Sequence, residues 1–424
     1  MNTEFEKITL KNGLRVILAP LPAFRSVTVL VLCAAGSRYE MPQTNGISHF
    51  LEHMFFKGTN KRQRASDISH ALDAIGADYN AFTGKETTAY HIKAASQHLP
   101  LLCDMLSDML WNSKFEENEI EKERGVIIEE LNLYEDTPMR RVGEIYEQVL
   151  WGDQPLGWDV GGTKEVIQKI TKRNFLDYID GRYAANNIVV AIGGDFKRAQ
   201  VLKLLKKYFG QQKPRDVATY QKVVESQAKA QLRITYKKSD QAHLVVGFRG
   251  LPLAHPDRYN VAILGTILGG GMSSRLFINV REKRGLAYYI HASHESYLDT
   301  GTLAAAAGVD LKRIDEALKV ILAQFVDLAQ KPVSARELKK AKDGVKGRLV
   351  LAWEDSRNVA LGYGLDELME GRIRSQDEYM KAIDRVTSAD VHRVARFLVS
   401  NNKLNLAVIG PFKDSERFSK ILKV

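Results

Sequence analysis

The sequence contains little cysteine and no long apolar run, and both shortages exclude classes of protein. Only two cysteines, Cys33 and Cys103, occur in 424 residues. Both lie in apolar segments, which predicts buried thiols in a reducing compartment such as the cytoplasm rather than a disulfide scaffold. No segment approaches the roughly 20 apolar residues of a membrane-spanning helix. The opening segment MNTEFEKITL lacks the pattern of a secretion signal, so we expect a cytoplasmic protein without a membrane partner.

The chain carries a formal net charge of +10, which raises the question of a nucleic-acid partner. Its basic residues are spread along the sequence beside acidic ones, as in EKERGVIIEE and ARELKKAKDG. No basic motif with interspersed aromatic residues accompanies them. This pattern favours a solvated surface, and we expect no nucleic-acid partner.

The length and an internal similarity predict two copies of one domain. A single hydrophobic core seldom serves so long a chain. NNIVVAIGGDF (186–196) resembles NNKLNLAVIGPF (401–412), and Thr171 and Thr387, which begin two similar helical segments, are separated by 216 positions. A shared offset at separate places favours duplication over chance. We expect a first domain over 1–212, a polar linker over 213–230 and a homologous second domain over 231–424.

The order of the expected elements predicts the fold class. EKITLKNGLRVILAP alternates around Asn12-Gly13, a hairpin pattern. We expect Thr44 or Asn45 to cap a helix that extends to about Lys57, and Ser66 to cap another helix that Gly76 ends. Further segments are two strands near 77–84 and 87–94, long helical patterns over 96–151, a helix from Thr171 and a strand at 187–193. Strands and helices that do not strictly alternate favour an α+β fold, in which each mainly antiparallel sheet carries helices on one face.

His49-Phe50-Leu51-Glu52-His53 is the most informative stretch of the sequence. On a helix, residues four apart share a face, so the two imidazoles can bind one zinc ion. Glu52 projects to one side of that face, where a general base for a water molecule belongs. The pattern is the inverted zinc-peptidase motif, and chance produces it about 0.01 times per chain of this composition. The alternative is that both histidines lie on a solvent-exposed helix surface. The apolar residues around them argue against it.

A third ligand is expected in FEENEIEKERGVIIEELNLYED. Read as a helix, this segment places Glu123, Val126, Ile127 and Glu130 on one face, which its apolar members should bury. Buried carboxylates are costly unless they meet a cation, whereas Glu129 points away and is expected in water. A slightly different helix phase, which leaves every glutamate solvated, is an alternative that spacing leaves open.

HFLEHMFFKGT and ERGVIIEELNLYED together resemble the pitrilysin/insulinase family of zinc peptidases. The similarity is to the short branch that contains the mitochondrial processing peptidase, and it implies that branch's metallohydrolase fold. It also implies that His49, His53 and Glu130 bind one zinc ion per chain. In the same comparison Glu52 is the general base and Glu123 a supporting acidic residue.

Two further segments are similar to motifs of that family. GADYNAFTGKETTAYH (76–91) resembles its substrate-binding edge strand, which implies that Asn80, Ala81 and Phe82 bind substrate. GGGMSSRLFINVREKRGLAYYI (269–290) resembles a second-domain motif with an arginine and a tyrosine seven residues apart, here Arg281 and Tyr288. Without this resemblance, the charged residues around Arg281 indicate only a solvated helix end. The three glycines that open the segment indicate a turn rather than a nucleotide-binding loop.

The predicted function is that of a zinc endopeptidase that cleaves unfolded polypeptides or peptides inside an enclosed chamber. The offset of 216 places Gly265 and Gly269 opposite His49 and His53, so the second domain lacks the metal motif. Because one chain carries both the zinc motif and the Arg281/Tyr288 motif, we expect a homodimer. A non-catalytic scaffold or partner subunit and a small-molecule hydrolase are the alternatives.

Overall fold

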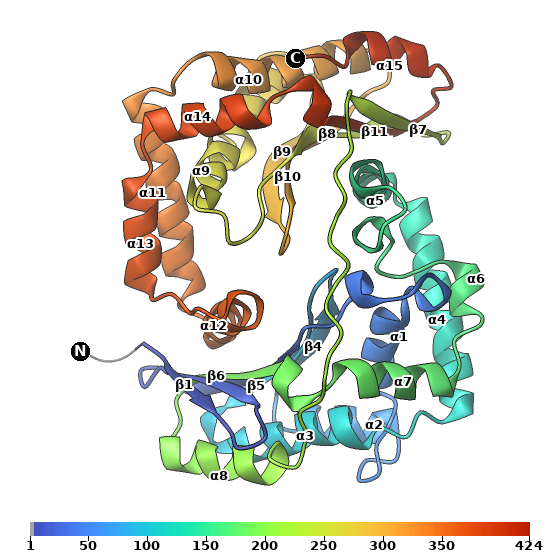
Figure 1. The fold of residues 1–424 in the computed structure, drawn as a ribbon, viewed down its shortest axis with the longest axis vertical. Coiled ribbons are helices and arrows are strands. Elements are labelled where there is room, and N and C mark those ends of the chain that lie inside the picture. The colour runs from blue at the N-terminus through green and yellow to red at the C-terminus, as the bar shows by residue number, and fades with distance from the viewer. Residues whose placement is uncertain (1–3) are drawn as a thin grey trace. The chain divides into compact units, whose positions relative to one another are not determined.

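The structure, a computed structural model, describes residues 4–424, which form two compact units. The first unit contains the residues up to Leu131 together with Trp158–Gln221 and Leu349–Asp377. The second contains Asn132–Gly157, Lys222–Arg348 and Glu378–Val424. Each unit has a sheet with packed helices, which confirms the predicted α+β class (Figure 1). Within residues 4–424, no helix is long and apolar enough to cross a membrane.

The first unit is built on a six-stranded sheet in the order β1-β2-β6-β3-β5-β4. Strands β2 and β6 run parallel, and the other neighbouring pairs run antiparallel. Side chains alternate between the two faces of a strand, and both faces of β3 are buried, which explains its continuous apolar run. The strands are β1 (Glu6–Thr9), β2 (Arg15–Pro20), β3 (Ser26–Cys33), β4 (Asp78–Thr83), β5 (Thr88–Ala95) and β6 (Ile188–Gly194).

Helices cover both faces of this first sheet, so the prediction of helices on one face only is wrong here, because α12 from late in the chain supplies a second layer. One face packs on helices from the N-terminal half of the chain, and α12 (Ser356–Glu370) packs on the other (Figure 1). Helix α12 approaches closely because it carries Gly364, where a Cβ would lie 2.3 Å from Cδ1 of Leu32. The remaining helices here are α1 (Ile47–Met54), α2 (Ala65–Asp73), α3 (Leu99–Asn112), α4 (Glu117–Asp136, in this unit up to Leu131), α6 (Lys164–Ile167), α7 (Lys172–Arg182) and α8 (Arg198–Tyr208).

The second unit is built on a five-stranded sheet in the order β7-β11-β8-β10-β9. Its strands are β7 (Gln231–Tyr236), β8 (Gln241–Arg249), β9 (Ala287–Ser296), β10 (Gly301–Asp310) and β11 (Leu404–Gly410). Helix α5 (Pro138–Trp151) buries Val142 and Ile145 against the sheet residues Val245 and Ile409. The other helices are α9 (Arg258–Gly269), α10 (Ile314–Gln330), α11 (Ala335–Ala352), α13 (Gln376–Arg385), α14 (Ser388–Leu398) and α15 (Ser415–Ile421).

Equivalent elements recur at the offset that the sequence shows. Thr171 and Thr387 are the N-caps of α7 and α14, and each forms a capping box with the residue three positions later. The strands that follow, β6 and β11, each pair in parallel with one neighbour and antiparallel with another. The two sheets therefore share one topology, with β1 added to the first.

Each compact unit contains one helix from the other half of the sequence. Helix α5 precedes the segment 213–230 but belongs to the second unit, and α12 follows that segment but belongs to the first. The chain leaves the first unit at Gln221, inside this segment. The compact units differ from the expected division mainly by these two helices. As a description of the duplicated sequence, the division into 1–212, 213–230 and 231–424 stays a prediction.

Two helix starts differ from the sequence prediction. Helix α1 begins after Gly46 rather than after Thr44 or Asn45, because the Glu40 carboxylate supplies the acceptors for its first backbone N–H groups. Helix α2 begins at Ala65 with Arg64 rather than Ser66 as its N-cap, since the Asp67 side chain accepts a hydrogen bond from the Arg64 backbone N–H. In both places an acceptor other than the predicted cap decides the start.

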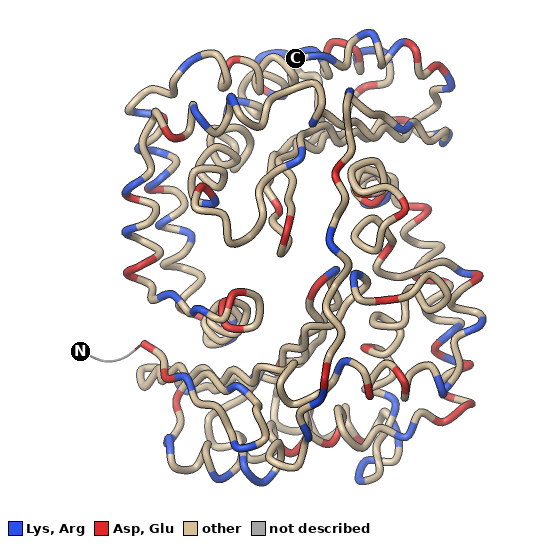
Figure 2. Tube along the Cα trace, in the orientation of Figure 1, with Lys and Arg blue, Asp and Glu red and all other residues tan. Residues whose placement is uncertain are grey.

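Acidic and basic residues are both present along much of the chain in the two units (Figure 2). In α11, for example, Lys339 and Asp343 lie one turn apart, with 2.5 Å between Nζ and Oδ2. Such exposed pairs add little stability each, and they intersperse the two signs of charge along the helices.

Candidate metal centre

Helix α1 is held in place by its apolar face. Ile47, Phe50, Leu51 and Met54 are fully buried, and the Phe50 ring packs edge-on against Phe175 with 4.9 Å between ring centroids. Because residues four apart share a helix face, this anchoring turns His49 and His53 together toward α4. Their side chains are 13% and 22% exposed, so a ligand can reach them.

The N-terminus of α1 is fixed by a buried carboxylate from outside the helix. The Glu40 side chain accepts hydrogen bonds from Gly46 N–H at 2.7 Å, from Ser48 N–H at 2.8 Å and from the Asn45 amide at 2.9 Å. Burial raises the pKa of this carboxyl, although these hydrogen bonds oppose the shift. Gly46 has a φ of 95°, a left-handed conformation that suits glycine. The sequence motif gave no indication of this cap.

His49, His53 and Glu130 meet at one point. Oε2 of Glu130 lies 3.7 Å from Nε2 of His49 and 3.6 Å from Nε2 of His53. A tetrahedral zinc ion with bonds of about 2.0–2.1 Å separates its ligand atoms by roughly 3.3 Å, so these three donors fit zinc after a shift of a few tenths of an ångström. Two imidazole nitrogens and one carboxylate oxygen are also the donor set of catalytic zinc sites.

Glu123 stands behind His53. Its Oε1 lies 2.8 Å from Nδ1 of His53, and its Oε2 lies 2.5 Å from Nζ of Lys57. Burial acts to raise the pKa of Glu123, but the hydrogen bonds from His53 and Lys57 outweigh it and lower that pKa. An ionised carboxylate on Nδ1 keeps a proton there and leaves Nε2 of His53 free to bind a metal.

The face of α4 is buried more narrowly than the sequence predicts. Glu123 and Ile127 are buried as expected, and Glu129 is exposed. Val126, expected on the buried face, is 51% exposed. The helix phase that solvates every glutamate is therefore wrong for Glu123, whose carboxylate is enclosed by two cationic or hydrogen-bonding partners. The difference at Val126 arises because the contact surface of α4 is a narrow stripe through Glu123 and Ile127.

Glu52 lies beside the two histidines, on the same helix. Its Oε2 accepts a hydrogen bond from Thr83 Oγ1 at 2.5 Å. Burial raises the pKa of the Glu52 carboxyl above its usual value, and the Thr83 hydrogen bond opposes this shift. A carboxyl with a raised pKa is suited to accept and return a proton near neutral pH. Thr83 was not among the residues that sequence reasoning selected, and its threonine-rich surroundings carry no distinguishing pattern.

A cavity of about 290 Å³ adjoins this group, and β4 forms one of its walls. Its lining residues are Glu52, His53, Phe56, Lys57, Tyr79, Asn80, Ala81 and Glu123. Strand β4 lies at one edge of the first sheet, and its residues alternate between exposed and half-buried. Asn80 and Ala81 thus lie next to the metal centre, while Phe82, which is 41% exposed, does not line the cavity. An edge strand of this kind offers its backbone groups to an extended peptide.

Arg281 and Tyr288 lie in the second unit, at two irregular places. Arg281 lies in the last turn of a π-helix over Phe277–Glu282, and its guanidinium lies 4.9 Å from the centre of the Phe277 ring. Tyr288 is 61% exposed at a register shift between β9 and β10, where a bulge redirects a side chain. Joint action of these residues with the metal centre of the first unit stays a prediction.

The second unit has glycines where the first has metal ligands. Gly265 and Gly269 both lie on α9, and a Cβ at Gly269 would lie 2.1 Å from the backbone nitrogen of Ala292. The glycines thus serve close packing of α9 against β9. Among residues 4–424, His49, His53 and Glu130 are the one group of three or more His, Cys, Asp or Glu side chains close enough to hold an ion.

Comparisons with known proteins agree on one family. Residues 15–164 match the family model described as insulinase (peptidase family M16), and residues 169–345 match the peptidase M16 inactive domain. An uncharacterized zinc protease of Bacillus subtilis, YmxG, is 35% identical over 407 residues, 96% of this chain and 98% of the relative. An uncharacterized zinc protease of Streptomyces coelicolor is 35% identical over 416 residues, 97% of this chain and 90% of that protein.

Solved structures share the fold along nearly the whole chain. A protease from Helicobacter pylori superimposes with a TM-score of 0.90 at 25% identity and covers 96% of this chain and 99% of its own. A Pseudomonas fluorescens protein, described as a peptidase M16 inactive domain, gives a TM-score of 0.89 at 18% identity, with coverage of 97% and 99%. The second likeness concerns the fold alone.

Proposed function

Because this chain belongs to the insulinase family of peptidases, M16, we propose that it is a zinc-dependent endopeptidase that cleaves peptides and unfolded polypeptides. The observation that carries the proposal is the convergence of His49, His53 and Glu130 on one point, with Glu52 beside them. A protein with a purely structural role has no need of this arrangement.

The chemistry follows from the side chains around that point. When bound by His49, His53 and Glu130, a zinc ion polarises a carbonyl oxygen and promotes the ionisation of water. Glu52 takes a proton from the attacking water and returns it to the leaving amine, and its raised pKa suits both steps. Thr83 holds one oxygen of Glu52 and leaves the other for the water.

The substrate is bound as an extended strand. The edge of β4 near Asn80, Ala81 and Phe82 has backbone groups that an unfolded peptide can pair with, whatever its side chains. We attribute selection against folded substrates to an enclosed chamber made by the two similar domains. A rigid folded protein should then resist cleavage while its denatured form is cut, and efficient cleavage inside a stably folded domain would contradict enclosure.

Zinc analysis coupled to a quenched-peptide assay tests the proposal. We expect one zinc ion per chain, peptide cleavage, loss of cleavage with a chelator and recovery when zinc is restored. A peptide library is assayed beside small amides, since preference for small amides would indicate a small-molecule hydrolase. Bound zinc without turnover of any unfolded peptide would favour a non-catalytic partner subunit, a reading that the complete donor set opposes.

The active assembly that we propose is a homodimer. Arg281 and Tyr288 would orient the substrate or stabilise the oxyanion, and one chain that carries every part needs no different partner. Mixing Glu52→Gln chains with Arg281→Ala chains shows where the site is completed, because activity recovers only if the parts come from different chains. A strictly monomeric, fully active enzyme in dilute solution would refute the dimer.

We place this function in the cytoplasm. Cys33 and Cys103 are both free and buried, and burial raises the pKa of each thiol to about 12. Unpaired cysteines of this kind suit a reducing compartment. Fractionation of the source cells with a thiol-labelling assay tests the assignment, and recovery of the protein outside the cytoplasm would overturn it.

A further inference from the structure

The segment between α1 and α2 is irregular, yet it is firmly attached to α3. Gly58 has a φ of 116°, and Thr59 forms an isolated bridge with Ser113. The backbone N–H of Asn60 donates to the carbonyl of Asn112 at 3.0 Å. This segment, residues 55–64, leads directly out of the helix that carries His49, Glu52 and His53, so its position bears on theirs.

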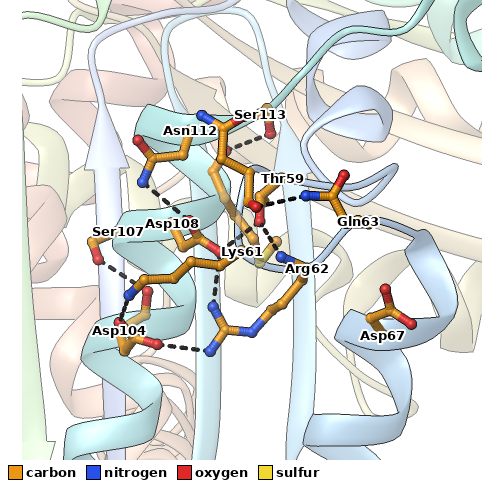
Figure 3. A network of polar contacts seen from close by, with 12 residues as sticks. Thr59, Lys61, Arg62, Gln63, Asp67, Asp104, Ser107, Asp108, Asn112 and Ser113 are labelled. Atoms are coloured by element: carbon orange, nitrogen blue, oxygen red, sulfur yellow. Dashed lines mark hydrogen bonds and ion pairs between the residues drawn. The ribbon is translucent and has the colours of Figure 1, made fainter.

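A buried charge network fastens the same segment through its side chains (Figure 3). Asp108 of α3 is 1% exposed and accepts hydrogen bonds from Thr59 Oγ1 at 2.6 Å and from Arg62 at 2.8 Å. A second nitrogen of Arg62 donates to Asp104 at 2.7 Å. A buried carboxylate with this many partners is geometrically restrictive, because moving any one of them leaves a charge unpaired. Residues 59–62 therefore have one favoured position on α3.

Lys57 projects from the start of this fixed segment onto Glu123. Its ammonium lies 2.5 Å from Oε2 of Glu123, a carboxylate whose side chain is only 7% exposed. The other oxygen of that carboxylate is on Nδ1 of His53 at 2.8 Å. The ion pair thus differs from an ordinary surface pair, since its acidic member is enclosed and shared with an imidazole.

We propose that Lys57 is a positioning residue of the metal centre, which fixes the Glu123 carboxylate so that His53 presents Nε2 to the ion. The proposal rests on the proposed zinc function for the identity of that ion. Without the ammonium, the enclosed carboxylate has one oxygen without a partner and is free to rotate off His53. The imidazole then loses the contact that sets its tautomer and its orientation.

The test measures metal binding, not activity alone. Zinc affinities of the apo-proteins are determined by competition with a chromophoric chelator for the wild type, Lys57→Met, Lys57→Arg and Lys61→Met. Lys61 is the matched control, since it lies in the same segment and pairs with Asp104 on the surface. We expect Lys57→Met to weaken zinc binding by about 10-fold, the lower end of the 10- to 100-fold loss typical for a group in direct contact with a metal ligand, because Lys57 acts through Glu123. Lys57→Arg should restore most of the affinity, and Lys61→Met should leave it unchanged.

Two further measurements separate positioning from a general structural effect. The visible spectrum of the cobalt-substituted protein should change in Lys57→Met and not in Lys61→Met, because it reports ligand geometry. In a Glu123→Gln background, Lys57→Met should add little further loss, since both changes break one chain of contacts. Urea unfolding of each apo-protein shows whether a variant is folded.

The outcomes are distinct. Wild-type zinc affinity in a folded Lys57→Met protein, an equal loss in Lys61→Met, or independent losses at Lys57 and Glu123 would each overturn the positioning role. If the wild type binds zinc but cleaves no peptide, the proposed peptidase function fails and the positioning role stands. If the wild type binds no zinc, both fail.

Discussion

Glu130 and Glu129 are adjacent on α4, and exchanging each for glutamine tests the assignment of the third ligand most directly. Oε2 of Glu130 lies 3.6 Å and 3.7 Å from the two histidine Nε2 atoms, whereas Glu129 is exposed. Both changes remove one negative charge and keep the size of the side chain. Their effects on the surrounding charge are therefore similar, and their effects on a bound ion should differ.

The expected magnitude follows from the share of one ligand. Zinc bound by four protein ligands has an apparent binding free energy of about 10–16 kcal/mol, so one ligand accounts for about 2.5–4 kcal/mol. At about 1.4 kcal/mol per tenfold change, Glu130→Gln should weaken binding by about 60- to 700-fold. The lower end is expected, because the glutamine oxygen remains a weak donor. Glu129→Gln should change the affinity by less than about threefold.

Chelator competition on the two apo-proteins measures this difference, and urea unfolding provides the control for folding. Both variants should unfold at similar urea concentrations in the absence of zinc, since neither glutamate is fully buried. Equal losses of zinc affinity at positions 129 and 130 would refute the geometric assignment. A larger loss at 129 would mean that α4 is rotated in solution relative to the arrangement described above.

Four other outcomes are expected. Glu52→Gln should retain zinc and lose about 10²- to 10⁴-fold in kcat, and loss of zinc in a folded protein would make Glu52 a ligand. Arg281→Ala should lower kcat/KM in the peptide assay at unchanged zinc content, and an unaltered rate would remove Arg281 from the mechanism. Phe50→Ala should cost about 3–5 kcal/mol of unfolding free energy in urea, because the ring is fully buried, and a cost below about 1 kcal/mol would contradict its anchoring role. Burial, with Arg357 nearby, lowers the pKa of His91, so its neutral form stabilises the folded state above about pH 6.5. As pH falls through the folded-state pKa this contribution is lost, so the wild type should lose stability relative to His91→Gln between pH 7 and 5, and parallel curves would refute the shift.

Local spacing predicts the parts of the site that lie on one helix. The four-residue interval between His49 and His53 and the helical face shared by Glu123 and Glu130 follow from the helical period alone. Glu40, Thr83 and Lys57 are different, because each acts through a partner on another element or beyond a turn. Their positions are set by tertiary packing, which leaves no periodic signal in the sequence.

In the fold, too, residues close in sequence predict some features, whereas contacts between residues far apart in sequence determine others. The hairpin at Asn12-Gly13 and the helices that begin after Thr171 and Thr387 form where the sequence predicts. The apolar stripes of α5 and α12 also indicate buried helices, but no local feature states which sheet each one covers. Packing of α12 against Ile17 and Leu30 joins residues more than three hundred positions apart, and it combines apolar contacts with polar ones such as the 2.9 Å hydrogen bond between the Thr28 and Ser356 hydroxyls.

The exchange of α5 and α12 has a consequence for synthesis on the ribosome. The first unit is complete in sequence up to Gln221 except for Leu349–Asp377, so one face of its sheet has no cover until that later segment emerges. At translation rates of about 5–20 residues per second, the delay is roughly 8–30 s. During this interval the face around Ile17, Leu30 and Ala191 is open to water, and the apolar stripe of α5 likewise precedes the strands that bury it. Neither unit can therefore complete its packing until the later segment has emerged, and apolar surface left exposed in that interval favours aggregation.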